Sequence, residues 1–371
     1  MTGCYICGDR SHVRILDKGP VDVWTDFGDD DSFNARYSCV LNQCAGCGHV
    51  YQPIDDALRQ LFGRIYQSRI AQGPSAMGAG RWGVERAESL FFRNIDLTPH
   101  RTAVEIGCGD GYLLRQLKAR GFTALTGIEP SANVDRAAAD GLTFINDFVD
   151  ARLRLPAPVD LIYSVAVFEH IEDITGVISF CRHHLRATGE LFFVVPNGQR
   201  QLELGDPALF VHQHVHQFTE HSLRMLLARH GFRINAITSH PDVLVVSAGL
   251  GESAQPPARS WPGYESYQPR LDKRLARIVD LLATRRVLVH GACNALNNIA
   301  GWSGGGAFDL ADNDDNRQGR TYFGRTVLSP RAVDLAKYSD VLVVPMPYYE
   351  PIAAQYVELG FSGRITGIST L

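Results

Sequence analysis

Residues 104–111 combine residue types and spacing that suit a ligand-binding turn. A short apolar run, 102–106, precedes alternating glycines, and a helix-forming stretch, 112–120, follows them. Glycine lets the backbone approach a ligand closely because it has no Cβ. The N–H groups and positive dipole end of the following helix point at whatever lies over the turn. The candidate binding residues of this turn are Glu105, Gly107, Cys108, Gly109 and Gly111.

Acidic residues after the next two predicted strands suit the same ligand. The apolar run 124–128 ends in Glu129, where a carboxylate can accept hydrogen bonds from two ribose hydroxyls. A third unit ends in Asp147 and Phe148, an acidic edge and an aromatic face that suit adenine. The pattern therefore predicts a site for a cofactor that contains a nucleoside.

Two more strand-like runs complete the pattern. The run 159–164 opens into Phe168-Glu169-His170, and the run 189–196 is entered through a glycine turn. The whole series resembles the class I S-adenosylmethionine-dependent methyltransferases. The resemblance implies S-adenosylmethionine as cofactor and adds Phe168 to the cofactor-binding residues. The alternative is a nicotinamide-binding Rossmann domain, which the tighter glycine spacing and the serial matches disfavour.

Four cysteines near the N-terminus are spaced as metal ligands. They form two Cys-x-x-Cys pairs, Cys4 with Cys7 and Cys44 with Cys47, separated by 36 residues that include Asp-rich loop material. Paired thiolates on tight turns are typical of zinc ribbons, and four thiolates leave no open position for catalytic water. We therefore expect a structural Zn²⁺ ion. The alternatives are two disulfides or reduced cysteines without a role, and Cys39 is left over as a core or loop thiol.

The order of these features predicts an α/β protein of three domains. They are an N-terminal zinc-binding domain (1–72), a methyltransferase core with a Rossmann-like fold (73–255) and a smaller C-terminal Rossmann-like domain (256–371). In the last domain, strand 286–290 leads into Gly291, and further strands and helices alternate, which implies a second parallel sheet. Its glycine turn lacks the full dinucleotide fingerprint, which disfavours NAD binding there.

This three-part order resembles the C-methyltransferases of nucleotide-linked ketosugar pathways, which add a branch methyl to deoxysugars. The resemblance covers almost the whole chain. It is most specific at the cysteine pairs, the glycine motif, the segments 168–173 and 211–219, and in the last domain at Asp312, Arg317–Arg320 and Gly324. The family typically has Tyr-His-Glu-His at the start of the histidine segment. This chain has Val211, His212, Gln213 and His214 there.

The resemblance implies roles for particular side chains. His214 would act as the base beside the reacting carbon, and His170 and Tyr66 would face the substrate, with His212 and Gln213 binding it. For a carbon acceptor the nucleophile is an enolate, and imidazole suits removal of a proton next to a ketone near neutral pH. Gln213 can hydrogen-bond a hydroxyl but cannot exchange a proton, which weakens a two-group acid–base scheme.

Other interpretations of the histidines stay open. His212, His214 and His216 alternate, so an extended segment would place them on one face, where they could bind a second metal. They could instead be polar residues of a loop before a helix. His170 could likewise only cap or pack at the end of its strand.

Composition limits the partners. The 371 residues carry a net charge of −4, with 36 basic and 40 acidic residues, so no general attraction to nucleic acid is expected. No apolar run approaches the length of a membrane-spanning helix, and we expect a cytoplasmic monomer or homodimer that acts on a small-molecule substrate. The rival functions are O- or N-methylation of a sugar or another small metabolite, and a zinc-ribbon scaffold with an inactive cofactor site.

Overall fold

The computed structural model describes residues 3–23, 35–68, 80–131, 141–252, 261–304 and 306–371. The chain divides into two compact units. The first comprises residues 1–13, 42–199 and 213–263, and the second comprises residues 14–41, 200–212 and 264–371. Each unit is assembled from separate stretches of the chain. The domain boundaries at 72/73 and 255/256 stay a prediction.

A mostly parallel sheet forms the centre of the first unit. Within the described residues, seven strands hydrogen-bond in the order β10-β11-β8-β7-β4-β5-β6. β4 is parallel to β5 and β7, whereas β11 runs antiparallel to both of its neighbours. The strands are β4 Thr102–Ile106, β5 Ala124–Ile128, β6 Thr143–Ile145, β7 Val159–Val165, β8 Leu185–Pro196, β10 Phe232–Ser239 and β11 Val243–Leu250. The predicted α/β core is confirmed.

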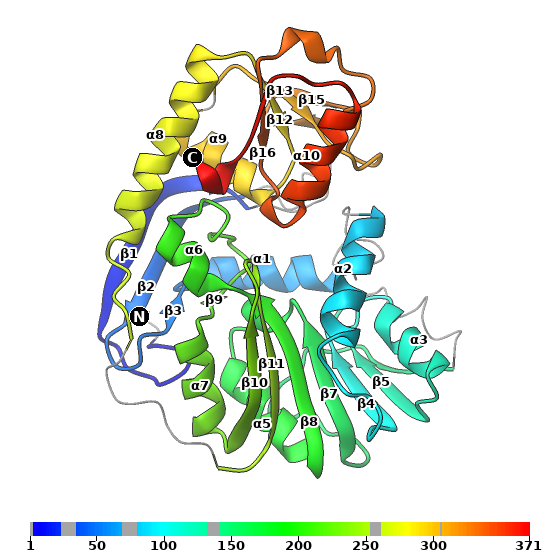
Figure 1. The fold of residues 1–371 in the computed structure, drawn as a ribbon. Helices are drawn as coiled ribbons and strands as arrows, with labels where there is room; N and C mark the ends of the chain where they lie inside the picture. Colours follow the sequence, from blue (N-terminus) through cyan, green and yellow to red (C-terminus); the bar gives the residue numbers. More distant parts are fainter. Residues whose placement is uncertain (1–2, 24–34, 69–79, 132–140, 253–260, 305) are drawn as a thin grey trace. The chain divides into compact units, whose positions relative to one another are not determined.

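Helices cover both faces of this sheet (Figure 1). Buried side chains of α5 (Ile174–His184) and α7 (Glu220–Arg229) share one apolar cluster with the strands. Those of α3 (Tyr112–Ala119) and the end of α2 (Gly80–Phe92) share a second cluster on the other side. A sheet buried on both faces needs strands that are apolar throughout, which explains the continuous apolar runs in the sequence.

One carboxylate joins the starts of two neighbouring strands. Oδ2 of Asp160, in β7, accepts the N–H groups of Arg101 and Thr102 at the start of β4, each at 2.9 Å. Its Oδ1 accepts a hydrogen bond from Arg186. Burial raises the pKa of Asp160, but the hydrogen bonds from Arg101 and Thr102 outweigh burial and hold the pKa below its ordinary value.

Asp160→Ala should lower the free energy of unfolding by about 2–3 kcal/mol at neutral pH, because two backbone N–H groups lose a charged acceptor. The folded-state pKa lies below the unfolded one. The contribution is therefore full above the unfolded value of about 3.9 and is lost as pH falls through the folded value. Urea titrations of both proteins at neutral and acidic pH measure this. A difference that does not shrink in acid would contradict the account.

The cysteine region contains more regular structure than the sequence predicts. β1 (His12–Asp22) and β2 (Arg36–Cys44) occupy most of the segment between the two cysteine pairs. The Asp-rich material predicted there falls within 24–34, which lies outside the described residues. The end of β2 pairs with β3 (Val50–Tyr51), and β3 pairs with β9 (His216–Gln217). The histidine segment and the second cysteine pair are therefore joined by strand pairing in the first unit.

The second unit contains the smaller sheet that the sequence predicts. Among the described residues its strand order is β14-β15-β13-β12-β16-β17, and all neighbours except β14 and β15 pair in parallel. The strands are β12 Val287–His290, β13 Asp309–Ala311, β14 Thr321–Tyr322, β15 Arg325–Leu328, β16 Asp340–Val343 and β17 Arg364–Gly367. The main helices of the unit are α8 Tyr267–Thr284, α9 Asn294–Ser303 and α10 Tyr349–Glu358. In the part of the chain that the structure describes, no helix has the length and apolar character needed to cross a membrane.

Candidate functional site

The glycine turn lies between β4 and α3, as predicted. Gly107, Gly109 and Gly111 have φ values of 74°, 54° and 78°, a region that other residues rarely adopt. A Cβ on Gly107 would also lie 2.4 Å from a methyl carbon of Val167. Gly111 is the N-cap of α3, so the turn leads into the positive end of a helix, where the N–H of Tyr112 donates to Asp110 at 3.1 Å. These features suit close contact with a cofactor.

Glu129, which directly follows β5, binds the backbone of the glycine turn through its carboxylate. Its Oε2 accepts the N–H of Gly109 and its Oε1 accepts the N–H of Ser131, each at 3.0 Å. Each carboxylate oxygen can accept a further hydrogen bond, so two ribose hydroxyls can still be bound. Glu105, in β4, is buried and accepts a hydrogen bond from Tyr163 at 3.0 Å, and burial raises its pKa well above the ordinary range. Glu105 therefore supports the strand end below the turn.

The other predicted cofactor residues differ in exposure. Asp147 and Phe148 follow β6 on the surface, where Phe148 is 42% exposed and free to cover a flat ligand. Phe168 is fully buried, with its ring centroid 4.9 Å from that of Phe193. Cys108 is buried in the apolar cluster beside α3. Phe168 and Cys108 could therefore contact a cofactor only through their backbone atoms.

Two helices and the segment before β9 bring the predicted catalytic residues Tyr66, His170 and His214 together in the first unit. α1 (Asp56–Gln67) is capped by Asp55, whose side chain accepts the N–H of Leu58 at 2.7 Å, and its buried face anchors the helix that carries Tyr66. The short helix η3 (Phe168–His170) follows β7 and carries His170. The ring of His170 lies 4.7 Å from that of His214 between centroids, and its Nδ1 lies 3.2 Å from the Tyr66 hydroxyl.

Hydrogen bonding sets the tautomer of His170. Its Nδ1 lies 3.0 Å from the carbonyl oxygen of Gln213, which also accepts a hydrogen bond from Tyr66 at 3.4 Å. A carbonyl oxygen can only accept, so Nδ1 carries the proton and Nε2 of the neutral ring carries a lone pair. Burial lowers the pKa of His170 to about 4, and burial together with His170 lowers that of His214 well below its ordinary value. Both rings are therefore neutral near pH 7.

The remaining predicted substrate residues make other contacts. Nε2 of His212 lies 3.0 Å from the carbonyl oxygen of Tyr37, and both residues belong to the second unit. Gln213 contributes its main-chain carbonyl to the histidine cluster, where the sequence predicts a role for its side chain.

His216 is not available for a metal shared with its neighbours. Its Nδ1 lies 2.9 Å from Nε2 of His49, and its Nε2 lies 2.8 Å from the carbonyl oxygen of Ile171. Both ring nitrogens are therefore in hydrogen bonds, which disfavours the metal site suggested by the alternating histidines. Sequence reasoning missed His49. Its signal is its position two residues after Cys47, immediately before β3.

Glu169 is a second residue that sequence reasoning missed, although it lies within the Phe168-Glu169-His170 motif. Its side chain is only 1% exposed, and burial raises its pKa to about 8. Oε1 lies 3.8 Å from Nε2 of His170, too long for a hydrogen bond. Oε2 is buried and has no hydrogen-bond partner among the described residues. This orphaned oxygen is unusual because buried polar atoms are nearly always paired.

The four predicted metal ligands converge in the first unit. Sγ of Cys4 lies 3.6 Å from that of Cys47, and Sγ of Cys7 lies 3.5 Å from that of Cys44. Tetrahedral zinc with bonds of about 2.3 Å places sulfurs about 3.8 Å apart, so the cluster fits such an ion. Turns at Gly8 (φ 77°) and Gly48 (φ 71°) follow the two pairs. All four sulfurs lie in one cluster of potential metal ligands.

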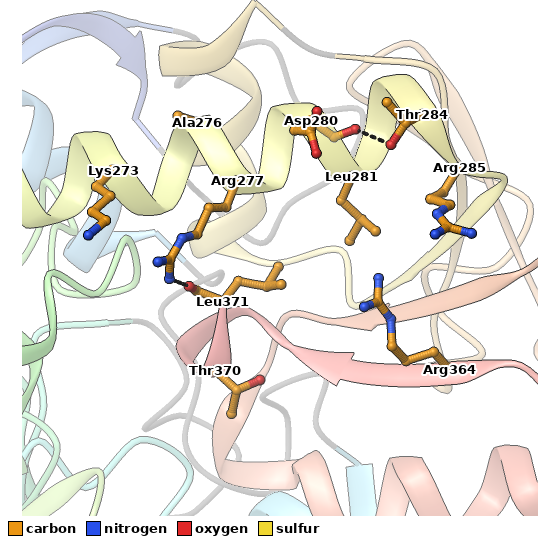
Figure 2. A pocket seen from close by; sticks show the side chains of 10 residues that line it. All are labelled: Lys273, Ala276, Arg277, Asp280, Leu281, Thr284, Arg285, Arg364, Thr370 and Leu371. Carbon is orange, nitrogen blue, oxygen red and sulfur yellow. Dashed lines mark hydrogen bonds between the residues drawn. The ribbon is translucent and has the colours of Figure 1, made fainter.

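A pocket of about 740 Å³ lies in the second unit (Figure 2). α8 contributes Lys273, Arg277 and Asp280 to its lining, β17 contributes Arg364, and the chain end contributes Leu371. None of the predicted site residues lines it.

Comparison with known proteins identifies the central part of the chain. Residues 81–237 match a family described as a methyltransferase domain. A trans-aconitate 2-methyltransferase from Azoarcus sp. (strain BH72) is 31% identical over 115 residues, which cover 30% of this chain and 45% of that protein. A ubiquinone biosynthesis O-methyltransferase from Nitrosomonas europaea is 29% identical over 105 residues, which cover 26% and 44%. The chain thus spans less than half the length of either relative.

Two solved structures are also similar to part of this chain. An S-adenosylmethionine-dependent methyltransferase from Mesorhizobium loti is 19% identical with a TM-score of 0.37, covering 48% of this chain and 100% of that one. The N-methyltransferase NodS from Bradyrhizobium japonicum WM9, in complex with S-adenosyl-l-homocysteine, is 17% identical with a TM-score of 0.37, covering 46% and 89%. The family match assigns residues 81–237 to a methyltransferase domain, and the glycine turn within it suits close contact with a cofactor.

Proposed function

We propose that the chain methylates a carbon atom next to the ketone of a nucleotide-linked sugar. The observation that carries this proposal is the cluster of His214, His170 and Tyr66 in the same compact unit as the glycine turn. A carbon acceptor needs a base, and the neutral ring of His214 can take the proton. The resemblance of almost the whole sequence to ketosugar C-methyltransferases supplies the substrate class.

The steps assigned to the protein follow from these side chains. A ring nitrogen of His214 takes the proton next to the ketone, and the electron pair of the C–H bond forms the enolate. Tyr66 can donate its hydroxyl proton to the enolate oxygen, and His170, whose Nδ1 lies 3.2 Å from that hydroxyl, would position it. Bound S-adenosylmethionine supplies a methyl group on a positively charged sulfur. Glu129, Asp147 and the glycine turn would hold and orient that cofactor.

His214→Ala should reduce methyl transfer by about 10²- to 10⁴-fold, the usual contribution of a general base. It should also stop exchange of the substrate's α-hydrogen with deuterated water, measured by mass spectrometry on a panel of nucleotide-linked 4-ketosugars. His183→Ala, at an exposed position on α5, is the matched control and should leave both rates unchanged. Unchanged turnover by a folded His214→Ala protein would contradict the base role.

O- or N-methylation of a sugar or another small metabolite is the second candidate. Val211 and Gln213 stand where the family has tyrosine and glutamate, and both curated relatives are named as small-molecule methyltransferases. An oxygen or nitrogen acceptor requires no exchange at carbon. Methyl transfer without deuterium uptake would therefore favour this candidate over C-methylation.

We also propose that Cys4, Cys7, Cys44 and Cys47 hold a structural Zn²⁺ ion. The sulfur separations fit a tetrahedral ion, and Gly46 donates its N–H to Sγ of Cys44 at 3.3 Å, which orients that ligand. Four sulfur ligands complete the coordination shell, so this ion would stabilise the fold and take no part in the reaction.

A further inference from the structure

A second group of potential metal ligands lies in the first unit. One ligand atom each from Glu169, His170 and His214 lies within 4.8 Å of the others. Glu169 is 1% exposed and His170 is 25% exposed, so the group is closed behind the carboxylate and more open beside the imidazole. A carboxylate with two imidazoles is a ligand set that proteins use for divalent transition metals.

The hydrogen bonds of His170 direct a lone pair toward Glu169. Since Nδ1 donates to the carbonyl oxygen of Gln213, Nε2 is the nitrogen left to bind a cation. A backbone carbonyl bonded to the opposite ring nitrogen is the usual arrangement for a metal-binding histidine. Nε2 and Oε1 of Glu169 face each other across 3.8 Å, and Oε2 has no partner among the residues described. A divalent cation placed between these two atoms would bind both of them.

The distance between Nε2 of His170 and Oε1 of Glu169 indicates whether a metal ion or a water molecule fits between them. Two atoms that share a tetrahedral metal with bonds of about 2.0–2.1 Å lie about 3.4 Å apart. Two atoms bridged by a water at hydrogen-bond distances of about 2.8 Å lie roughly 4.6 Å apart. The observed 3.8 Å is nearer to the metal value. A direct hydrogen bond would require about 3 Å.

We propose that Glu169, His170 and His214 form a second metal site for a divalent transition-metal ion of the Zn²⁺ or Co²⁺ type. Imidazole ligands favour such ions over Mg²⁺ and Ca²⁺, which prefer oxygen ligands throughout. The consequence for activity rests on the proposed function. An ion at this site occupies the lone pair of His214 that the base needs, so the metal-loaded form is inhibited.

The test uses the purified protein with its cysteine site first filled with Zn²⁺. Co²⁺ is then titrated in, and its binding is measured by calorimetry and by visible absorption. We expect one further equivalent of Co²⁺, with d–d bands and without sulfur-to-cobalt charge transfer. Glu169→Gln and His214→Ala should each weaken this binding by about 100-fold or more, since even residues behind the ligands contribute about 10- to 100-fold. His183→Ala should bind Co²⁺ like the wild type.

Absence of the further equivalent would overturn the proposal, as would Co²⁺ binding that is equally tight in both ligand variants. Glu169→Gln preserves the volume of the buried side chain, and circular dichroism checks its fold. If Glu169→Gln does not fold, His214→Ala provides the test, because His214 is only half-buried. If His214→Ala loses Co²⁺ binding but keeps methyl transfer, the metal site stands and the base role of His214 is refuted. Failure of the metal-site proposal can therefore be told apart from failure of the proposed function.

Discussion

Cys44→Ser should abolish zinc binding at the proposed cysteine site and lower the midpoint of thermal unfolding by about 10 °C or more. Structural zinc sites contribute about 10–16 kcal/mol of binding free energy in small domains, and that energy stabilises the folded state. In domains of 150–250 residues, each kcal/mol corresponds to about 2–4 °C. Cys44 is buried and its sulfur lies 3.5 Å from that of Cys7, so serine would leave a gap in the ligand set. Elemental analysis and differential scanning calorimetry measure the two effects.

Cys39→Ser is the control for this experiment. Cys39 is fully buried but belongs to the second unit and lies outside the cysteine cluster. Its replacement should leave the zinc content unchanged, whatever it does to stability. A Cys44→Ser protein that keeps its full zinc content and its unfolding midpoint would show that the four cysteines do not form a zinc site.

Glu129→Ala should weaken S-adenosylmethionine binding by about 10²- to 10⁴-fold. Two hydrogen bonds to a charged group contribute about 1.5–3 kcal/mol each, and each 1.4 kcal/mol is a tenfold change in affinity. The N–H groups of Gly109 and Ser131 also lose their acceptor, so the glycine turn is no longer held in place. Titration calorimetry with the cofactor alone measures this without any methyl acceptor.

Glu190→Gln is the matched control for cofactor binding. Glu190 is another carboxylate of the same sheet, in β8, where it contacts His100 and Ser247. Among the described residues, its hydrogen-bond partners are His100 and Ser247 and not the glycine turn, so its replacement should leave the cofactor affinity unchanged. Equal affinities for wild type and Glu129→Ala would contradict the assignment of Glu129 to the ribose.

The fold could be predicted because its signals are local. The strand 102–106 and the helix 112–120 agree with β4 and α3 to within a residue, since an apolar run ends there at glycines that need positive φ. The ligand set of the cysteine cluster was also visible, because Cys-x-x-Cys spacing reflects the geometry of a single turn. The strands β1 and β2 between the pairs were not predicted, because the sheet that contains them is completed through β3 by β9, a segment distant in the sequence.

The histidine segment shows what sequence patterns miss. Alternation predicts one shared face, but the chain is extended only at β9, and His216 turns to His49 and Ile171. Gln213 contributes a carbonyl oxygen, which every residue type has, so no side-chain pattern could reveal this contact. The isolation of Glu169 Oε2 likewise depends on the tertiary surroundings of a buried side chain.

The pairing of β3 with β9 has a consequence for the biogenesis of the protein. Val50 and Tyr51 hydrogen-bond to Gln217 and His216, and the N–H of Gln52 donates to the carbonyl oxygen of Val215 at 2.9 Å. A nascent chain completes the cysteine region long before residues 213–217 leave the ribosome. β3 is therefore available before β9, and the histidine segment can take its register from an N-terminal segment that the proposed zinc site would hold in place.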